Sequence, residues 1–161
     1  MDAVRLFVYG TLRAGGGLDH LLTGQRQPAL TQPGWSLYEY AGGAYPVMIP
    51  IGSGCVRGDV IDIDIESDEW CHVESMERRS GYHLTTLSVA TLTRTTVTMR
   101  DGIGQHVQDI TLTDTEVGEA ITFAWYHADD DGIGPRVEDG DWIEHEAMLT
   151  PEAWLYRDAR L

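Results

Sequence analysis

Residues 5–13 read Arg-Leu-Phe-Val-Tyr-Gly-Thr-Leu-Arg, an apolar run that ends on a glycine followed by a hydroxyl residue. The run from Leu6 to Tyr9 predicts a buried β-strand, and Gly10 with Thr11 predicts the turn that follows it. Backbone N–H groups that leave a strand in such a turn converge on one point and form a small anion cradle. A glycine at this position lets a ligand approach the backbone closely. The stretch therefore predicts a binding site, whose chemistry depends on the group that another part of the chain brings to it.

The size and composition of the chain are those of an ordinary globular domain. It has 161 residues, of which 42% are hydrophobic and 23% are charged. We therefore expect a single domain over residues 1–161 with a sizeable core. No segment approaches the ~20 consecutive apolar residues that a membrane-spanning helix needs, and the first residues lack the basic and apolar regions of a signal peptide. These features predict a cytoplasmic protein with no membrane partner.

The chain is strongly acidic. It has 26 Asp and Glu residues against 11 basic residues, for a formal net charge of −15, and every basic residue is an arginine. A surface of this sign repels phosphate backbones, which argues against a nucleic-acid partner. The absence of lysine excludes Schiff-base catalysis by a lysine and phosphate capture by a P-loop lysine.

The two cysteines, Cys55 and Cys71, lack the CxxC spacing of a zinc or redox motif. We expect them to be small buried residues in a reducing compartment and not a disulfide. A catalytic thiol is the less favoured alternative, because no residue near either cysteine in the sequence would lower the thiol pKa.

Strand patterns dominate the chain, separated by short turns rich in glycine and aspartate. In Val56–Ile65 the alternation of Ile61, Ile63 and Ile65 with aspartates indicates one dry and one wet face. Residues 129–134 are expected to form a loop, and a short helix is expected to start near Thr150. We predict strands at Leu6–Tyr9, Gly34–Tyr38, Tyr45–Ile49, Val56–Ile65, Tyr82–Met99, Val107–Leu112 and Ala120–His127. The predicted fold class is α+β: a mostly antiparallel, partly closed, barrel-like sheet with a few short helices.

One helix is expected from about Ser67 to Arg79, with Ser67 in the N-cap region. Trp70 and Val73 recur at helical spacing, and Met76 or Glu77 continues the same side.

Glu77 is the candidate proton-transfer residue on this helix. A carboxyl near the apolar side is partly desolvated, which raises its pKa toward the operating pH and makes it a usable general base. The alternative is an ordinary pair of acids, Glu74 and Glu77, on a solvated face beside Arg78 or Arg79.

A series of short motifs follows one order along the chain. They are Phe7–Arg13, Gly17–Leu22, Gly34–Tyr38, Ala44–Pro46, Val56–Val60, Val73–Glu77 with Tyr82 after it, Ala124–Tyr126 and Glu138–Trp142. Together they resemble the γ-glutamylcyclotransferase family, also called AIG2-like or BtrG-like. Three features depart from the family pattern: Asp19 stands where the family has Asn, Arg78 where Gly is frequent, and residues 89–119 form a longer hairpin than usual.

The resemblance implies an enzyme that cleaves a γ-glutamyl amine or amide by intramolecular cyclisation, releasing 5-oxoproline and the free amine. It implies Glu77 as general acid and base, facing a turn whose Gly10, Thr11 and Leu12 amides hold the α-carboxylate or the developing oxyanion. The Tyr9 ring would form a wall of the pocket, and Tyr126 would donate a hydrogen bond to the substrate. The implied chemistry needs no metal and no organic cofactor.

Other interpretations remain open at this point. A non-catalytic member of the same fold would bind a small molecule in the cleft or a protein through residues 89–119. The departing amine could be a lysine side chain, an aminoglycoside-like precursor or another small molecule. The acidic run near Asp129–Asp131 is expected to be a solvated loop and not a calcium site, and the tryptophans are expected in the core. The oligomeric state has no signature in the sequence.

Overall fold

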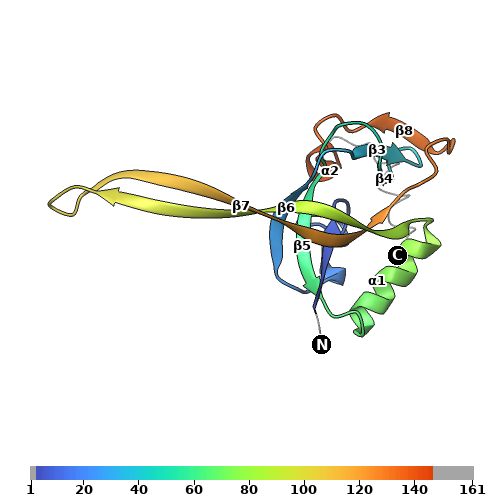
Figure 1. The fold of residues 1–161 in the computed structure, drawn as a ribbon, viewed down its shortest axis with the longest axis horizontal. Helices are drawn as coiled ribbons and strands as arrows, with labels where there is room; N and C mark the ends of the chain where they lie inside the picture. Colours follow the sequence, from blue (N-terminus) through green and yellow to red (C-terminus); the bar gives the residue numbers. More distant parts are fainter. Residues whose placement is uncertain (1–2, 147–161) are drawn as a thin grey trace.

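The opening strand of the chain is part of a closed β-barrel in a computed structural model that describes residues 3–146 (Figure 1). Neighbouring strands are antiparallel except β1 and β7, whose parallel pairing at Leu6 and Ile121 closes the barrel. Around the barrel the order is β1 (Val4–Val8), β5 (Arg57–Ile63), β2 (Arg26–Thr31), β6 (His83–Arg100) and β7 (His106–Ala124).

A separate three-stranded sheet lies beside the barrel, with β3 (Ser36–Tyr40) between β4 (Tyr45–Ile49) and β8 (Ile133–Arg136). The helical segments are η1 (Asp19–Leu21), α1 (Asp68–Arg79) and α2 (Trp142–Glu146). The predicted α+β class with a barrel-like, mostly antiparallel sheet is therefore confirmed. The helix expected near Thr150 lies outside the described residues.

The helix α1 forms where its capping and periodicity predicted it. The hydroxyl of Ser67 accepts a hydrogen bond from the Trp70 N–H at 3.1 Å, which caps the first turn. Trp70 and Val73 are buried, and the Trp70 ring stacks on Phe123 of β7 with centroids 5.7 Å apart. The helix ends before Gly81, whose φ of +100° favours glycine. Packing of this apolar side holds α1 against the barrel.

The structure corrects several expectations about strands. The two strands expected at Val107–Leu112 and Ala120–His127 are one continuous strand, β7, because β6 pairs with it over its whole length. Its outer half and that of β6 project from the barrel as a long ribbon (Figure 1). The run expected to be a loop at 129–134 contributes Ile133 and Gly134 to β8, because β3 offers it an edge to pair with. Strand β2 was not expected, since Pro28 interrupts the strand pattern of Arg26–Thr31.

The burial expected of the cysteines was wrong for Cys71. It is exposed on the solvent side of α1, whereas Cys55 is half-buried, and both are free thiols. Of the tryptophans, Trp70, Trp125 and Trp142 are buried, Trp35 is half-buried and Trp154 lies outside the described residues. Within residues 3–146 no helix is long and apolar enough to cross a bilayer.

Candidate active site

The turn after β1 leaves one set of backbone donors unused. The carbonyl of Gly10 accepts from the Arg13 N–H at 3.1 Å, and the carbonyl of Thr11 accepts from the Leu18 N–H at 2.8 Å. By contrast, no backbone carbonyl between residues 3 and 146 accepts a hydrogen bond from the N–H of Gly10, Thr11 or Leu12. All three residues line one cavity. Two carbonyls of the turn are thus paired with nearby N–H groups, and three adjacent N–H groups have no backbone acceptor within the described part of the chain.

Arg26 fixes this turn from the side away from the cavity. Its guanidinium donates to the carbonyl of Leu12 and, at 2.7 and 3.0 Å, to two carbonyls of the following segment. Asp59 of β5 lies 4.0 Å from the guanidinium and accepts the Ala14 N–H at 2.7 Å. Five N–H groups in a rigid fork suit arginine to holding several carbonyls at once. The turn is thus braced by a half-buried ion pair between β2 and β5.

A second ion pair ties the turn to the end of the described chain. The guanidinium of Arg13 lies 2.7 Å from the carboxylate of Asp141, just before α2. Trp142, the next residue, is fully buried. The motif at 138–142 therefore anchors the turn and contributes no side chain to the lining of the cavity.

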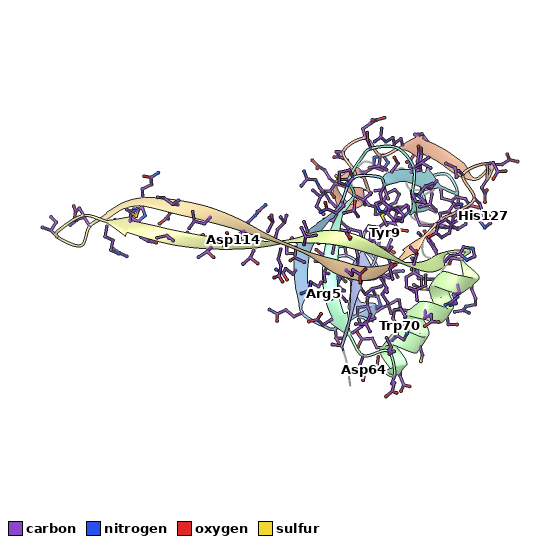
Figure 2. All side chains as sticks on the ribbon, in the orientation of Figure 1. Arg5, Tyr9, Asp64, Trp70, Asp114 and His127 are labelled. Carbon is purple, nitrogen blue, oxygen red and sulfur yellow. The ribbon has the colours of Figure 1, made fainter. Side chains whose placement is uncertain are left out.

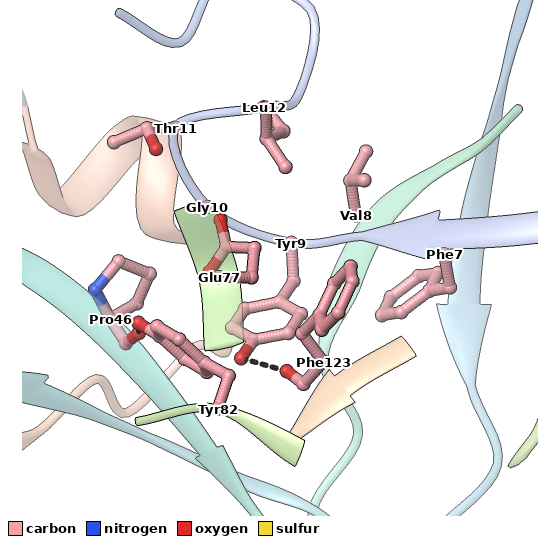
Figure 3. A pocket seen from close by; sticks show the side chains of 10 residues that line it. All are labelled: Phe7, Val8, Tyr9, Gly10, Thr11, Leu12, Pro46, Glu77, Tyr82 and Phe123. Atoms are coloured by element: carbon pink, nitrogen blue, oxygen red, sulfur yellow. Dashed lines mark hydrogen bonds between the residues drawn. The ribbon is translucent and has the colours of Figure 1, made fainter. Parts of the chain in front are cut away.

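Glu77 reaches the cavity from α1. Its side chain lies on the buried side of the helix with Val73, and the residue is only 5% exposed. Figure 3 shows its carboxyl group under the Gly10 turn, beside the Tyr9 ring. Glu74, in contrast, forms a surface ion pair with Arg78 at 3.0 Å. The two acids that the sequence presented as a pair thus lie in opposite environments, one solvated and one in the cavity.

Two tyrosines hold the walls of the cavity. The Tyr9 hydroxyl donates to the carbonyl of Phe123, and the Tyr82 hydroxyl donates to the carbonyl of Pro46 (Figure 3). Both rings are buried. The complete lining is Phe7, Val8, Tyr9, Gly10, Thr11, Leu12, Pro46, Glu77, Tyr82 and Phe123. A buried carboxyl, three amide donors and aromatic walls are the ingredients of a proton-transfer site for a small anionic molecule.

The cavity is narrow, about 30 Å³, which is room for one or two water molecules. Glycine is required at its rim, because a Cβ on Gly10 would lie 2.6 Å from Cγ of Pro46. Pro46, part of a motif noted without a role, thus lies directly against the Gly10 turn.

The comparisons with known proteins agree with this geometry. A family model described as γ-glutamyl cyclotransferase, AIG2-like, matches residues 6–144. The chain belongs to the AIG2-like γ-glutamyl cyclotransferase family. No curated protein sequence matches it.

Solved structures share the AIG2-like fold of this chain at low sequence identity. A protein of Arabidopsis thaliana, solved in solution, has a TM-score of 0.56 and 22% identity over 84% of this chain and 77% of its own. A protein specific to uropathogenic E. coli has a TM-score of 0.62 and 15% identity over 93% of this chain and 100% of its own. YkqA from Bacillus subtilis has a TM-score of 0.52 and 23% identity over 91% of this chain, which spans 42% of YkqA.

One site residue expected from the AIG2-like resemblance lies elsewhere. Tyr126 is 48% exposed, its ring is tilted against that of His83 with centroids 6.0 Å apart, and it does not line the cavity. Strand β7 ends at Ala124, Trp125 is the last buried residue of this segment, and residues 126–129 are all exposed, so Tyr126 lies just beyond the buried part. Tyr82, which the motif pattern contained without a role, lines the cavity together with Tyr9. Tyr9, Gly10, Thr11, Leu12 and Glu77 all line the cavity.

Sequence reasoning missed the residues that brace the AIG2-like site. Arg26 lies on a strand that was not predicted, and its role depends on carbonyls of a distant turn, which leave no pattern in the sequence. Asp59 was part of a strand motif, and only its partners reveal its function. No cluster of three or more His, Cys, Asp or Glu side chains among residues 3–146 could hold a metal ion.

Proposed function

We propose that the protein cleaves a γ-glutamyl amine or amide by intramolecular cyclisation, giving 5-oxoproline and the free amine. One observation carries the proposal: a buried carboxyl, Glu77, shares a cavity with three backbone donors that no carbonyl between residues 3 and 146 uses. The family match supports the reaction class. The nature of the amine stays open, because no described residue of the cavity identifies it.

In the proposed reaction the α-amine of the glutamyl group attacks the γ-carbonyl carbon. A new C–N bond closes the five-membered ring as the bond to the departing amine breaks. The α-amine is an ammonium at neutral pH, so it must lose a proton before it attacks. Glu77 takes that proton and delivers it to the departing nitrogen. The attacking nitrogen loses a second proton as it becomes the ring amide, and the released amine takes up that proton as an ammonium. The reaction therefore balances without water or a cofactor.

The Gly10, Thr11 and Leu12 amides bind the α-carboxylate or the oxyanion that develops on the γ-carbonyl. Because Arg26 and Asp59 brace the turn, these dipoles need no reorganisation during the reaction. The attack is intramolecular, so much of the acceleration comes from holding the glutamyl group in a folded, near-attack shape. The aromatic walls formed by Tyr9 and Tyr82 suit that task.

A second candidate is a member that binds a glutamyl-like molecule without turnover. The cavity volume of about 30 Å³ does not separate the two candidates, since a glutamyl group enters for binding or for turnover only if the lining side chains move. Isothermal titration of an unhydrolysed γ-glutamyl compound, followed by recovery of the intact compound, distinguishes binding from catalysis.

The test of the proposed function is release of 5-oxoproline from a panel of γ-glutamyl amines and amides. We expect Glu77→Gln to lower kcat by about 10² to 10⁴-fold, the usual contribution of a general acid–base group. Glu74→Gln is the matched control, because Glu74 is on the same helix and solvated, and we expect its turnover to stay near wild type. Full turnover by Glu77→Gln would refute the role of Glu77.

A further inference from the structure

The ribbon formed by β6 and β7 continues far beyond the barrel. Strand β2 pairs with β6 only from Thr91 inward, so among the described residues the strand pairing of 92–115 is only internal, while Gln27 of β2 donates to the Thr93 hydroxyl at 2.9 Å. We call residues 92–115 the arm (Figure 1). An isolated two-stranded hairpin is marginally stable in water, and its unpaired edges invite association. A ribbon of this kind is therefore expected to gain stability by association with a partner.

One face of the arm carries four exposed apolar side chains, between Asp114 near the root and Gln108 near the tip on the same face. In the register of the ribbon, Val97 lies opposite Ile110 and Thr95 opposite Leu112, with Met99 next on the same face. Val97, Ile110, Leu112 and Met99 are 40%, 38%, 52% and 46% exposed. We call these four side chains the strip. Such a contiguous apolar face on an extended element is typical of an interface.

The other face of the arm is polar. It carries Thr96 opposite Thr111 and Thr98 opposite Asp109. The contrast between apolar side chains on one face and polar side chains on the other is typical of a sheet with one buried face. In the described part of the chain, however, neither face of the arm is covered. The pattern fits a ribbon with one covered and one solvated face.

The charge of the arm favours a second copy as the partner. The arm has two arginines and three aspartates, a net charge of −1, in a chain whose net charge is −15. Two barrels repel each other strongly, whereas two arms do not. Because the arms project from the barrels, they can pack together while the acidic bodies stay apart (Figure 2).

The root of the arm has a groove that suits the tip of another arm. The groove has a volume of about 450 Å³ and is lined in part by Pro28, Leu92, Arg5 and Arg94, with Asp62 as its acidic residue. Neither arginine forms an ion pair or a side-chain hydrogen bond with another residue between 3 and 146. This groove is a rare cationic site on an acidic protein.

The tip of the arm complements the groove. Ile103 is 83% exposed, and Asp101 beside it accepts the loop N–H groups of Ile103 and Gln105 at 3.0 and 2.9 Å. The tip thus presents an apolar side chain next to a carboxylate. The groove presents apolar walls next to two unpaired guanidinium groups.

We propose that the arm is a self-association element. Two copies pack their strips face to face and head to tail about a two-fold axis, and each tip enters the groove at the root of the other arm. This isologous arrangement uses the same strip, tip and groove from each copy and therefore closes as a dimer.

The size of this interface sets the expected affinity. From Thr93 to Asp101 the ribbon runs about 27 Å at 3.4 Å per residue. Two such ribbons with their tips in the grooves bury on the order of 1,000 Å², near the lower bound for a specific association. We therefore expect a reversible dimer with a dissociation constant in the micromolar range.

Sedimentation velocity on the full chain, between about 1 and 200 µM, tests the proposal in the range expected for such an interface. We expect wild-type protein to shift from monomer to dimer. Val97→Asp and Ile110→Asp should each weaken the dimer at least ~10-fold, because they place a charge in a desolvated strip. Thr96→Asp on the opposite face of β6 is the matched control and should dimerise like wild type. A wild-type chain that stays monomeric over this range overturns the proposal and indicates a different partner. An equal loss of dimer affinity in Thr96→Asp overturns the role of the strip.

A disulfide experiment tests the head-to-tail arrangement. In a Cys55→Ser, Cys71→Ser chain, we expect Thr93→Cys combined with Ile103→Cys to form a covalent dimer on oxidation. The two new cysteines cannot react within one chain, since the arm holds them about 27 Å apart. The chain with Ile103→Cys alone should remain uncrosslinked, and a covalent dimer of that single variant would overturn the head-to-tail arrangement. Neither experiment depends on the proposed catalytic activity.

Discussion

The guanidinium of Arg26 donates a hydrogen bond to the carbonyl oxygen of Leu12, and this contact joins an unpredicted strand to the turn that faces Glu77. The same guanidinium holds two further carbonyls and lies beside Asp59. One side chain thus gives the cradle its shape.

We expect Arg26→Gln to lower the free energy of unfolding by about 2–4 kcal/mol, because carbonyls lose a charged donor and buried Asp59 loses its cation. Urea unfolding followed by tryptophan fluorescence measures the change. Arg57→Gln, an exposed arginine of the neighbouring strand, is the control and should alter stability by less than ~0.5 kcal/mol. A loss of similar size in both variants would contradict the bracing role.

Gly10→Ala should damage the cradle. The new Cβ would lie 2.6 Å from the Pro46 ring, so either the turn or β4 must move. We expect a stability loss of about 1–3 kcal/mol, as for overpacking elsewhere, and at least ~10-fold lower 5-oxoproline release if the proposed reaction is correct. Gly102→Ala, which meets no atom within 4 Å, should cost nothing in either measurement.

Tyr82→Phe and Tyr126→Phe should behave differently. Loss of the Tyr82 hydroxyl leaves the buried Pro46 carbonyl without its donor, which we expect to cost about 1–2 kcal/mol of stability. Tyr126 is half-exposed and outside the cavity, so its hydroxyl should be dispensable for folding and for turnover. Thermal unfolding and product release measure both variants. A Tyr126→Phe protein that folds normally but loses activity would restore the role first expected for Tyr126.

The stability of the protein should fall in strong base through Tyr40. Burial raises the pKa of Tyr40 above 10.0, and the adjacent Asp130 carboxylate, which accepts its hydroxyl, raises it further. The folded state therefore holds the phenol proton more tightly than the unfolded state does, so this contribution is present below pH 10 and is lost as the pH rises through the folded-state pKa. Urea titrations between pH 8 and pH 11 should show a smaller decline for Tyr40→Phe than for wild type. Equal declines would exclude Tyr40 as the cause.

Much of the candidate site was readable in the sequence because it depends on local signals. The apolar run Leu6–Tyr9 and the glycine after it predicted the strand and its turn. The Ser67 cap and the spacing of Trp70 and Val73 predicted α1, and this periodicity placed Glu77 near the buried side. Each of these features is decided by neighbours within a few residues along the chain.

Other features depend on contacts between distant residues. Tyr82 lines the cavity because its hydroxyl reaches the carbonyl of Pro46 on β4, whereas Tyr126 follows the end of β7 and is exposed. Strand β2 forms despite Pro28 because β5 and β6 both pair with it. The arm is one ribbon because β6 supplies an unbroken partner for β7.

The sequence by itself determined the strand–turn–helix elements and the residue types that carry the chemistry, since turn, capping and periodicity signals act over a few residues. Only the tertiary structure decided which groups meet. It brought Glu77 into one cavity with a turn 67 positions earlier, and it placed the Arg26 guanidinium where it donates to a carbonyl of that turn. It also left the strip of the arm exposed in the described chain. Pairing and packing across such separations depend on the closure of the whole barrel, and no local pattern encodes that closure.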